Sequence, residues 1–258
     1  LKGRIMTHDS MQIVAYGPSL QDSWKEINPD EPLITMSGSL KFLLEKGLKP
    51  RFNKWFHCDV DPRPHKAKLM AKHEDVVYIM ASCANPLTFT ALEGMKIVLF
   101  HAMSGPHTKT WIEENDSTQL MTCGGSTVGL TSIHVAGIMG FYHFEIFGMD
   151  GGFKDDKRHA GFHGGVVHGQ RDSVFHPGWT TSRLMDNANF ETCTMLRSFP
   201  VCCVWHGEGL LQDWVSKSKI ENVALHGTPK AEIVRKTYYK RATPEVAAQA
   251  LAKARKAA

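Results

Sequence analysis

The sequence predicts an α/β fold: a Rossmann-like, mostly parallel sheet with helices on both faces. Short apolar segments of strand length alternate with segments whose apolar residues recur at helical spacing. This alternation favours a parallel sheet, because each crossover helix covers one face of it. Several predicted strands also end in glycine-rich turns that lead into helices, which is typical of such folds. The 258 residues suffice to bury a full core.

Seven short apolar segments are predicted as buried strands because each ends at a turn or a polar residue. They are Gln12–Tyr16, Pro32–Met36, Lys54–Cys58, Val76–Met80, Lys96–Leu99, His143–Phe147 and Val201–Val204. Apolar residues at helical spacing predict helices over Ser39–Gly47 and Ser126–Gly140. A further helix is predicted from Thr243, which caps it, with Pro244 at its first position.

Charge and composition predict two regions: a Rossmann-like domain over residues 6–228 and a basic helical tail over residues 229–258. The tail holds eight Lys/Arg and two Asp/Glu, whereas the whole chain has a net charge of +4. The tail is either a solvated helix or a contact for a phosphate-rich partner such as nucleic acid. No apolar run approaches the roughly 18 residues of a membrane span, so no membrane partner is expected. Six cysteines without a CxxC pair predict reduced thiols and a cytoplasmic protein.

The segment "MQIVAYGPSLQDSW" predicts an anion site at the end of the first strand. A parallel strand that enters a helix through a glycine turn exposes free backbone N–H groups, and the helix dipole adds partial positive charge. Gly17 permits close approach, Pro18 stiffens the turn, and Ser19 can cap the helix or donate its hydroxyl. The turn therefore either binds phosphate or is an ordinary connection between a strand and a helix.

The segment "HCDVDPRP" places Asp59 and Asp61 at the end of another predicted strand. On an extended chain, alternate side chains point to the same face. Two carboxylates there can hold Mg²⁺ together with substrate phosphates. They can also hydrogen-bond a ribose, or simply form the turn before Pro62.

The segment Thr122–Phe153 predicts one complete loop, helix, strand and loop. Its first loop contains Gly124, Gly125, Ser126 and Thr127, and its second loop contains Asp150. Both glycine-rich ends are expected on the sheet edge that carries the Gly17 turn, where ligands of open parallel sheets bind.

The stretch from Gly148 to Gly178 is rich in glycine and histidine and has no clear periodicity, which predicts an active-site loop. It contains His159, His163, His168 and His176. The His159 and His163 pair has metal-ligand spacing only on a helix, which the neighbouring glycines oppose. A general base or a phosphate contact is the favoured role for one of them, because imidazole titrates near neutral pH. Plain loop histidines are the other interpretation.

Together, "VAYGPSL", "ITMSGSLKFLLEKGLKPRFNKWFHCDVDPRP" and "GGSTVGLTSIHVAGIMGFYHFEIFGMDGGF" resemble the MptE-like family. That family is named after 6-hydroxymethylpterin diphosphokinase and includes the central domain of motor accessory factor flagellin glycosyltransferases. It is similar in fold to bacterial sialyltransferases. The resemblance implies a Rossmann-like transferase that binds a nucleotide or nucleotide-sugar donor.

The resemblance also implies roles for individual residues. Gly17, Pro18 and Ser19 would contact the donor phosphates, Gly124 to Thr127 would line the nucleotide pocket, and Asp150 would lie beside it. Asp59 and Asp61 match a metal-binding acidic strand end, which implies Mg²⁺. His159 or His163 would serve as the catalytic general base.

One segment departs from the family. Where the pterin enzymes resemble one another in a "HAHGDN" stretch, this chain has "FHAMSGPH", which keeps only His101. Glycosyl transfer from a nucleotide sugar to a hydroxyl acceptor, with a polyanion such as DNA as one candidate, is therefore the first hypothesis. A Mg²⁺-dependent diphosphokinase and a non-catalytic nucleotide-binding protein are the alternatives. A homo-oligomer is compatible with all three.

Overall fold

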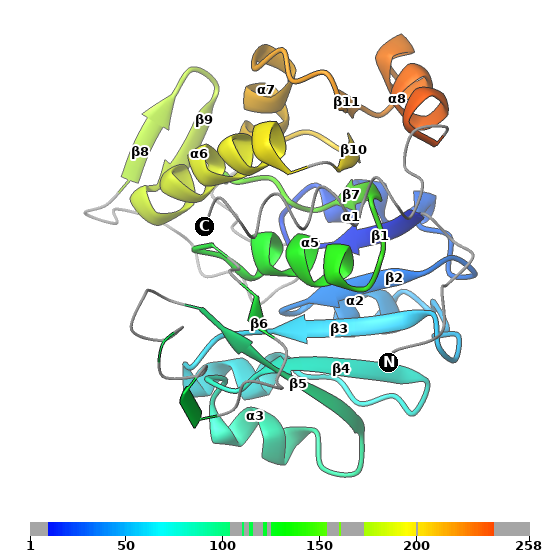
Figure 1. Ribbon diagram of the computed structural model, residues 1–258, viewed down its shortest axis with the longest axis vertical. Helices are drawn as coiled ribbons and strands as arrows, with labels where there is room; N and C mark the ends of the chain where they lie inside the picture. The colour runs from blue at the N-terminus through cyan, green and yellow to red at the C-terminus, as the bar shows by residue number, and fades with distance from the viewer. Residues whose placement is uncertain are drawn as a thin grey trace.

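The computed structural model describes residues 10–103, 110, 114–115, 121–122, 125–153, 160, 173–199 and 201–239. They form a nine-stranded sheet in the order β11-β10-β7-β1-β2-β3-β4-β5-β6, and each neighbouring pair is parallel. Figure 1 shows helices on both sides of this sheet, with α5 in front of the central strands and α2 behind them. The predicted α/β class is therefore confirmed.

All seven predicted strands are present, with ends shifted by a few residues. The strands of the large sheet are β1 Ser10–Val14, β2 Leu33–Met36, β3 Trp55–Asp59, β4 Val76–Ala81, β5 Lys96–Ala102, β6 Met121–Thr122, β7 His143–Phe147, β10 Cys202–Trp205 and β11 Val223–Leu225. The edge strands β6 and β11 were not predicted because they are too short to show a pattern. A separate antiparallel hairpin, β8 Ser173–His176 with β9 Trp179–Ser182, was also not predicted.

The helices predicted over residues 39–47 and 126–140 are confirmed in shorter form. The helical elements are α1 Leu20–Ser23, η1 Trp24–Glu26, α2 Ser39–Glu45, η2 Pro64–Leu69, α3 Pro86–Ala91, α5 Val128–Ile138, α6 Arg183–Ser198, α7 Leu210–Lys217 and α8 Pro229–Tyr239. The helix predicted from Thr243 lies outside the described residues.

The sheet separates two apolar layers because neighbouring residues of each strand point to opposite faces. On one face, Ile13 and Ile34 are buried in one cluster with Ile133 of α5. On the other face, Val14 is buried in a second cluster with Leu40 of α2. Helices packed against both faces leave the ends of the strands as the place where a ligand can enter.

Helix α8 begins the predicted basic tail, but it packs on the sheet. Ala231 and Val234 of α8 are buried together with Cys202 and Val204 of β10 and Ala224 of β11. Residues 229–239 therefore cover the β10 and β11 end of the sheet, whereas residues 240–258 lie outside the described part of the chain.

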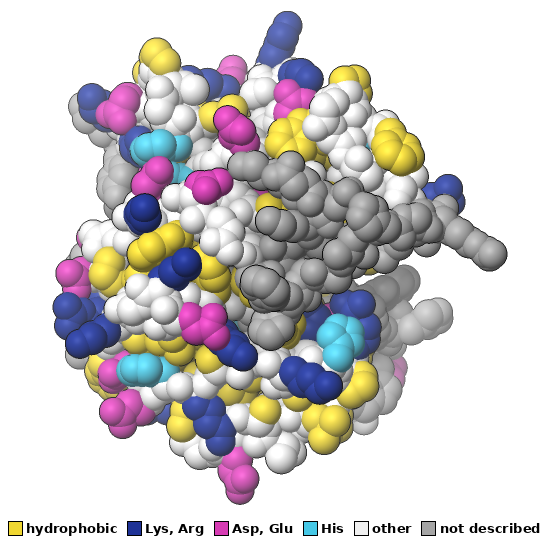
Figure 2. Space-filling view, turned by 180° about the vertical axis from the view of Figure 1, so that it is seen from behind, with side chains coloured by type: hydrophobic (Ala, Val, Ile, Leu, Met, Phe, Trp, Pro, Cys, Tyr) yellow, Lys and Arg dark blue, Asp and Glu magenta, His cyan; other side chains and the backbone are white. Residues whose placement is uncertain are grey.

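The helices show whether any segment could span a membrane, and one face of the surface shows whether charge gathers in a patch. Among the described residues, no helix is both long enough and apolar enough to span a membrane. Figure 2 views the molecule from behind the face seen in Figure 1. On the described part of this rear face, basic and acidic side chains are interspersed, with no broad area of one charge. On this face, the described residues therefore offer no extended basic surface for a polyanion.

The strand order reverses beside β1, and this reversal creates a crevice. The chain builds the sheet outward from β1 to β6, returns through α5 to place β7 on the other side of β1, and then adds β10 and β11. Connections that leave neighbouring strands in opposite directions open a crevice at their carboxyl ends, which is where open α/β sheets bind ligands. The segments that follow β1 and β7 are the two glycine turns singled out in the sequence.

Candidate functional site

A cavity of about 450 Å³ opens at the carboxyl edge of the sheet, where the strand order reverses. The segments that follow β1, β2, β3 and β7 line it, together with the start of α5 and part of α6. Five of the residues predicted for the site line this cavity: Gly17, Asp61, Ser126, Thr127 and Asp150. The expected arrangement of the Gly17 turn beside both glycine-rich ends of the segment 122–153 is thus found.

Gly17 is held against the end of β7 so closely that a side chain has no room. Its amide donates a hydrogen bond to the carbonyl oxygen of Gly148 at 2.7 Å. A Cβ atom on Gly17 would lie 2.5 Å from that same oxygen and 2.6 Å from Oδ2 of Asp150. Glycine is therefore required here for the close approach of the end of β7, and its predicted contact with a phosphate stays a prediction.

The amide that follows Gly17 and Pro18 already binds a carboxylate. The Ser19 N–H donates to Oδ2 of Asp150 at 2.7 Å, and the Ser19 hydroxyl donates to Oδ1 at 2.5 Å. Gln212 donates to the same Oδ1 at 3.1 Å, and Ser19 and Asp150 are both buried. Neither Pro18 nor Ser19 lines the cavity. Phosphate binding by Ser19 stays a prediction, and it requires Asp150 to leave.

The N-terminus of α5 forms a second anion position at the same cavity. Thr127 caps the helix by accepting from the Leu130 amide. The Ser126 amide and hydroxyl donate to Oε2 of Glu191, at 2.9 and 2.7 Å. Gly125 precedes them with a φ of +66°, which glycine adopts readily. Gly124 lies outside the described residues. In this structure Glu191 takes up both Ser126 donors, and phosphate binding by Ser126 and Thr127 stays a prediction.

Asp59 and Asp61 differ in their surroundings, because only Asp61 lines the cavity. Asp59 is buried and accepts the Asp61 amide, while its Oδ2 has no hydrogen-bond partner. Burial raises the pKa of Asp59, although hydrogen bonds and Lys66 oppose the rise. Asp61 lines the cavity, and despite partial burial its pKa falls to about 2 because Arg63 hydrogen-bonds it. A Mg²⁺ ion shared by both stays a prediction.

Lys66 on η2 is a cavity residue that the sequence analysis missed. Its ammonium donates to the Ser37 hydroxyl at 2.9 Å and lies 3.5 Å from Oδ2 of Asp61. Lys66, Ser37 and Arg63 all line the cavity. The available signal was the basic run directly after the acidic strand end in "DVDPRPHKAK", since residues just past a strand end lie at the ligand edge.

Of the four histidines in the predicted active-site loop, only His176 lies among the described residues. His159 and His163 lie outside the described residues, as does most of the loop that carries them. His176 lies on β8, where its Nε2 is 2.6 Å from Oδ1 of Asp186. His101, the residue kept from the pterin pattern, contacts the Ser82 hydroxyl at 2.7 Å. The general base therefore stays a prediction.

The cavity holds groups of the kind that bind anions, although Arg63 and Lys66 are both paired with Asp61. Lys66 and Arg63 supply positive charge at one side, and the Ser126 amide at the N-terminus of α5 supplies a donor at another. The volume falls in the range that suits a small-molecule or cofactor ligand. Donors fixed in this way can stabilise negative charge that develops on a departing phosphate.

Comparison with known proteins gives one family and one solved structure. A family model described as 6-hydroxymethylpterin diphosphokinase MptE-like matches residues 1–156. The structure of a MAf glycosyltransferase from Magnetospirillum magneticum AMB-1 superposes with a TM-score of 0.61 at 18% sequence identity. The match covers 96% of this chain but only 37% of that one, so this chain spans well under half of its length. At that identity the likeness shows the fold alone. No curated protein matches the sequence.

Proposed function

The chain belongs to the MptE-like family, and from this membership and the carboxyl-edge cavity we propose that it is a glycosyltransferase. The proposed reaction moves a sugar from a nucleotide-sugar donor to a hydroxyl acceptor. The family and the MAf glycosyltransferase neighbour indicate a transferase, without specifying the group that is transferred. The donor, the acceptor and the sugar are parts of the proposal.

The observation that carries the proposal is the placement of Lys66 beside the strand-end turns. Lys66 is only 12% exposed in its side chain, and it is held by Ser37 and Asp61. A positive charge fixed at the ligand edge of a parallel sheet suits the diphosphate of a sugar donor or the phosphate of a CMP sugar. Its ammonium would offset the charge that develops on the nucleotide as the glycosidic bond breaks.

The proposed reaction also needs a general base and a hydroxyl acceptor, and it includes a Mg²⁺ ion. His159 or His163 would remove the proton of the acceptor hydroxyl while the sugar carbon bonds to that oxygen and the nucleotide departs with the electron pair. The acceptor is proposed as a hydroxyl compound, and the charge of residues 229–258 favours a polyanion. Mg²⁺ at Asp59 and Asp61 would add to the charge of Lys66.

Direct binding tests the proposal. Full-length protein is titrated by calorimetry with UDP, CMP, GDP and their sugar conjugates, and its melting temperature is measured with each. We expect one nucleotide and its sugar conjugate to bind and to raise the melting temperature. Slow release of free nucleotide from the conjugate would support transfer chemistry. If none of these nucleotides or conjugates changes the melting temperature or releases heat, the proposal is wrong.

Replacing Lys66 with glutamine should weaken nucleotide binding by about 10- to 100-fold, because a hydrogen bond to a charged group contributes roughly 1.5–3 kcal/mol. Lys68→Gln is the matched control, since Lys68 lies on the same η2 turn, is exposed and does not line the cavity. Calorimetry of both variants gives the comparison. Equal affinities of the two variants would exclude Lys66 from the donor site.

Replacing Glu191 with glutamine should strengthen nucleotide binding by about fivefold, which corresponds to about 1 kcal/mol. The carboxylate of Glu191 occupies the Ser126 amide and hydroxyl and must leave before a phosphate can use them. The neutral amide holds these donors less strongly and does not repel a phosphate. Glu208→Gln is the control because Glu208 is exposed and does not line the cavity. Weaker binding in Glu191→Gln would instead show that Glu191 contacts the donor.

A further inference from the structure

A second cavity, of about 370 Å³, lies on the sheet face opposite α5 and holds a cluster of histidines and carboxylates. Glu145 of β7 and Gln12 of β1 line it from the sheet, and Arg235 of α8 closes it from the side. Neither the family resemblance nor the proposed transfer reaction uses these residues. The cluster therefore needs its own explanation.

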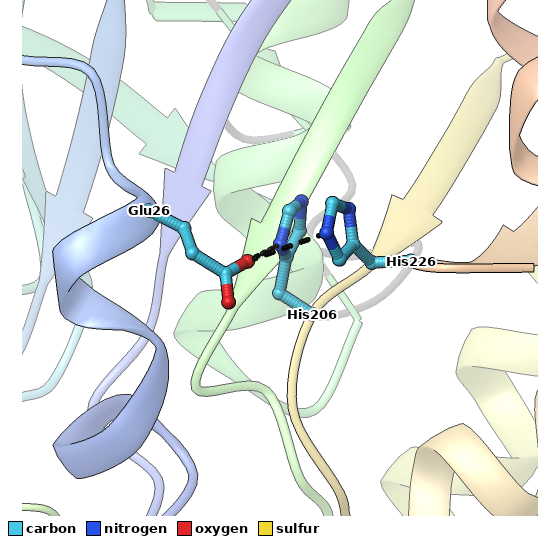
Figure 3. Close-up of side chains that lie close together, drawn as sticks. All are labelled: Glu26, His206 and His226. Atoms are coloured by element: carbon cyan, nitrogen blue, oxygen red, sulfur yellow. Dashed lines mark hydrogen bonds and ion pairs between the residues drawn. The ribbon is translucent and has the colours of Figure 1, made fainter.

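Three side chains from three elements meet at this cavity, as Figure 3 shows. Glu26 ends η1, His206 follows β10, and His226 follows β11. Oε2 of Glu26 is 2.6 Å from Nδ1 of His206 and 3.7 Å from Nε2 of His226. These three ligand atoms all lie within 4.8 Å of one another. Two imidazoles and one carboxylate are ligands that a divalent transition metal prefers.

The surroundings of His206 resemble those of a metal-bound histidine. The ring is buried between the rings of Phe147 and His226, with centroids at 4.0 and 4.2 Å. Its other nitrogen, Nε2, lies 2.6 Å from Oε2 of Glu145. Metal-bound histidines usually donate their second N–H to a carboxylate, which fixes the ring and makes it a better ligand. Glu145 is placed for that role.

The charge of the cluster favours a cation. Two carboxylates, Glu26 and Glu145, contact His206. The guanidinium of Arg235 beside them makes two hydrogen bonds to Glu145, at 2.7 and 2.8 Å, and also pairs with a third carboxylate, Glu232. Lys236 lies 3.8 Å from Glu232 but is 80% exposed. A cation between Glu26 and the two histidines would balance this excess of negative charge.

We propose that Glu26, His206 and His226 bind one divalent transition-metal ion of the zinc class. Three protein ligands leave a fourth position of a tetrahedral zinc ion open, and all three of these ligands line the second cavity. The ion would bind Oε2 of Glu26, Nδ1 of His206 and Nε2 of His226.

Binding requires only side-chain adjustments. Zinc bonds of about 2.0–2.1 Å would separate the Glu26 oxygen and the His206 nitrogen to about 3.3 Å. His226 must turn from its stacked position and give up the contact between its Nδ1 and Arg235, now 3.1 Å long. Glu26 and His226 are about half exposed, at 48% and 44%, so both can move without disturbing the core.

The site also connects the two cavities through a short helical segment. Glu26 ends the segment that begins with Ser19, whose hydroxyl and amide bind Asp150. Gln212 donates both to Asp150 and to the carbonyl oxygen of His206. A metal ion would therefore fix η1 to the ends of β10 and β11, directly beside the turn that carries Gly17.

Zinc titration of the full chain tests this inference. Protein treated with a chelator and then freed of it is titrated with ZnCl₂ by calorimetry and by competition with a coloured zinc indicator. A crystal is then examined at the zinc absorption edge. We expect one equivalent to bind, a higher melting temperature, and an anomalous peak between Glu26, His206 and His226. None of these measurements depends on nucleotide or on turnover.

The half-exposed ligands provide variants that should still fold. Glu26→Gln and His226→Gln should each weaken zinc binding at least 100-fold, and Glu145→Gln should weaken it by about 10- to 100-fold as a supporting carboxylate. His65→Gln is the control, because His65 is an exposed histidine outside the cluster, and it should bind zinc like the unchanged protein. Stoichiometric binding that survives in Glu26→Gln and His226→Gln, an anomalous peak elsewhere, or no zinc binding by the folded protein would each overturn the proposal.

Discussion

Replacing Asp150 with alanine is expected to lower the free energy of unfolding by about 1–3 kcal/mol, the usual cost of leaving a buried hydrogen-bond donor without its acceptor. Asp150 is buried and accepts three hydrogen bonds, from the amide and hydroxyl of Ser19 and from Gln212. Without it, the buried amide and hydroxyl of Ser19 lose this acceptor, whereas Gln212 keeps its hydrogen bond to the carbonyl oxygen of His206. Urea unfolding followed by circular dichroism gives the difference.

Two further variants separate this effect from a general loss of charge. Asp150→Asn keeps the shape but places an amide group opposite one Ser19 donor, so we expect an intermediate loss. Asp213→Ala is the control: Asp213 forms an ion pair with Lys217, which is 71% exposed, and such pairs contribute about 0–1 kcal/mol. Similar losses in Asp150→Ala and Asp213→Ala would contradict a central role for Asp150.

Acid is expected to destabilise the protein strongly between pH 6.5 and pH 3 because of His57. Burial, aided by the nearby charge of Lys66, lowers the pKa of His57 from 6.5 to about 3. The unfolded chain therefore takes up a proton below pH 6.5, whereas the folded protein does so only near pH 3. The stability is complete above pH 6.5 and falls as the pH drops, by about 1.4 kcal/mol for each pH unit and on the order of 4–5 kcal/mol in total.

A variant without the titrating ring isolates this effect. His57→Phe keeps a ring of similar size in the buried site, where Nε2 of His57 has no hydrogen-bond partner. Its free energy of unfolding, measured in urea from pH 7 to pH 4, should depend much less on pH. Below about pH 4 both proteins should lose stability, because carboxylates such as Asp61, with a pKa of about 2, then take up protons in the unfolded chain first. Equal slopes above pH 4 would rule out His57 as the cause.

Most of the strands were predictable because nearly every residue in them is buried, although β5 is mostly exposed or half-buried. Ser10–Val14, Leu33–Met36 and Cys202–Trp205 are fully or almost fully buried, so their apolar runs stand out without any alternation. The hairpin from Ser173 to Ser182 carries partly exposed residues, including Phe175 at 77% exposure, and shows no such run. Burial on both faces of a parallel sheet is what makes a strand visible in a single sequence.

The location of the candidate site could be predicted from the sequence, but the side-chain contacts within it could not. Glycine at position 17 and the turn after β7 could be located because a close backbone approach demands glycine. That Asp150 occupies the Ser19 amide, and Glu191 the Ser126 amide, depends on side chains 131 and 65 residues apart in the chain. Local patterns carry no information about such distant pairs, and the same holds for Glu26 with His206 and His226.

The short helical segment from Leu20 to Glu26 is anchored at both ends, and this has a thermodynamic consequence. One anchor is the hydrogen bond from Ser19 to Asp150 at its start, and the other is the contact between Glu26 and His206 at its end. Gln212 joins the two anchors by donating hydrogen bonds to Asp150 and to the carbonyl oxygen of His206. Any occupant that stiffens one anchor lowers the entropy cost of ordering the other. If the proposed occupants of the two cavities each stiffen one of these anchors, their binding is energetically linked, and each alters the affinity for the other by the same factor.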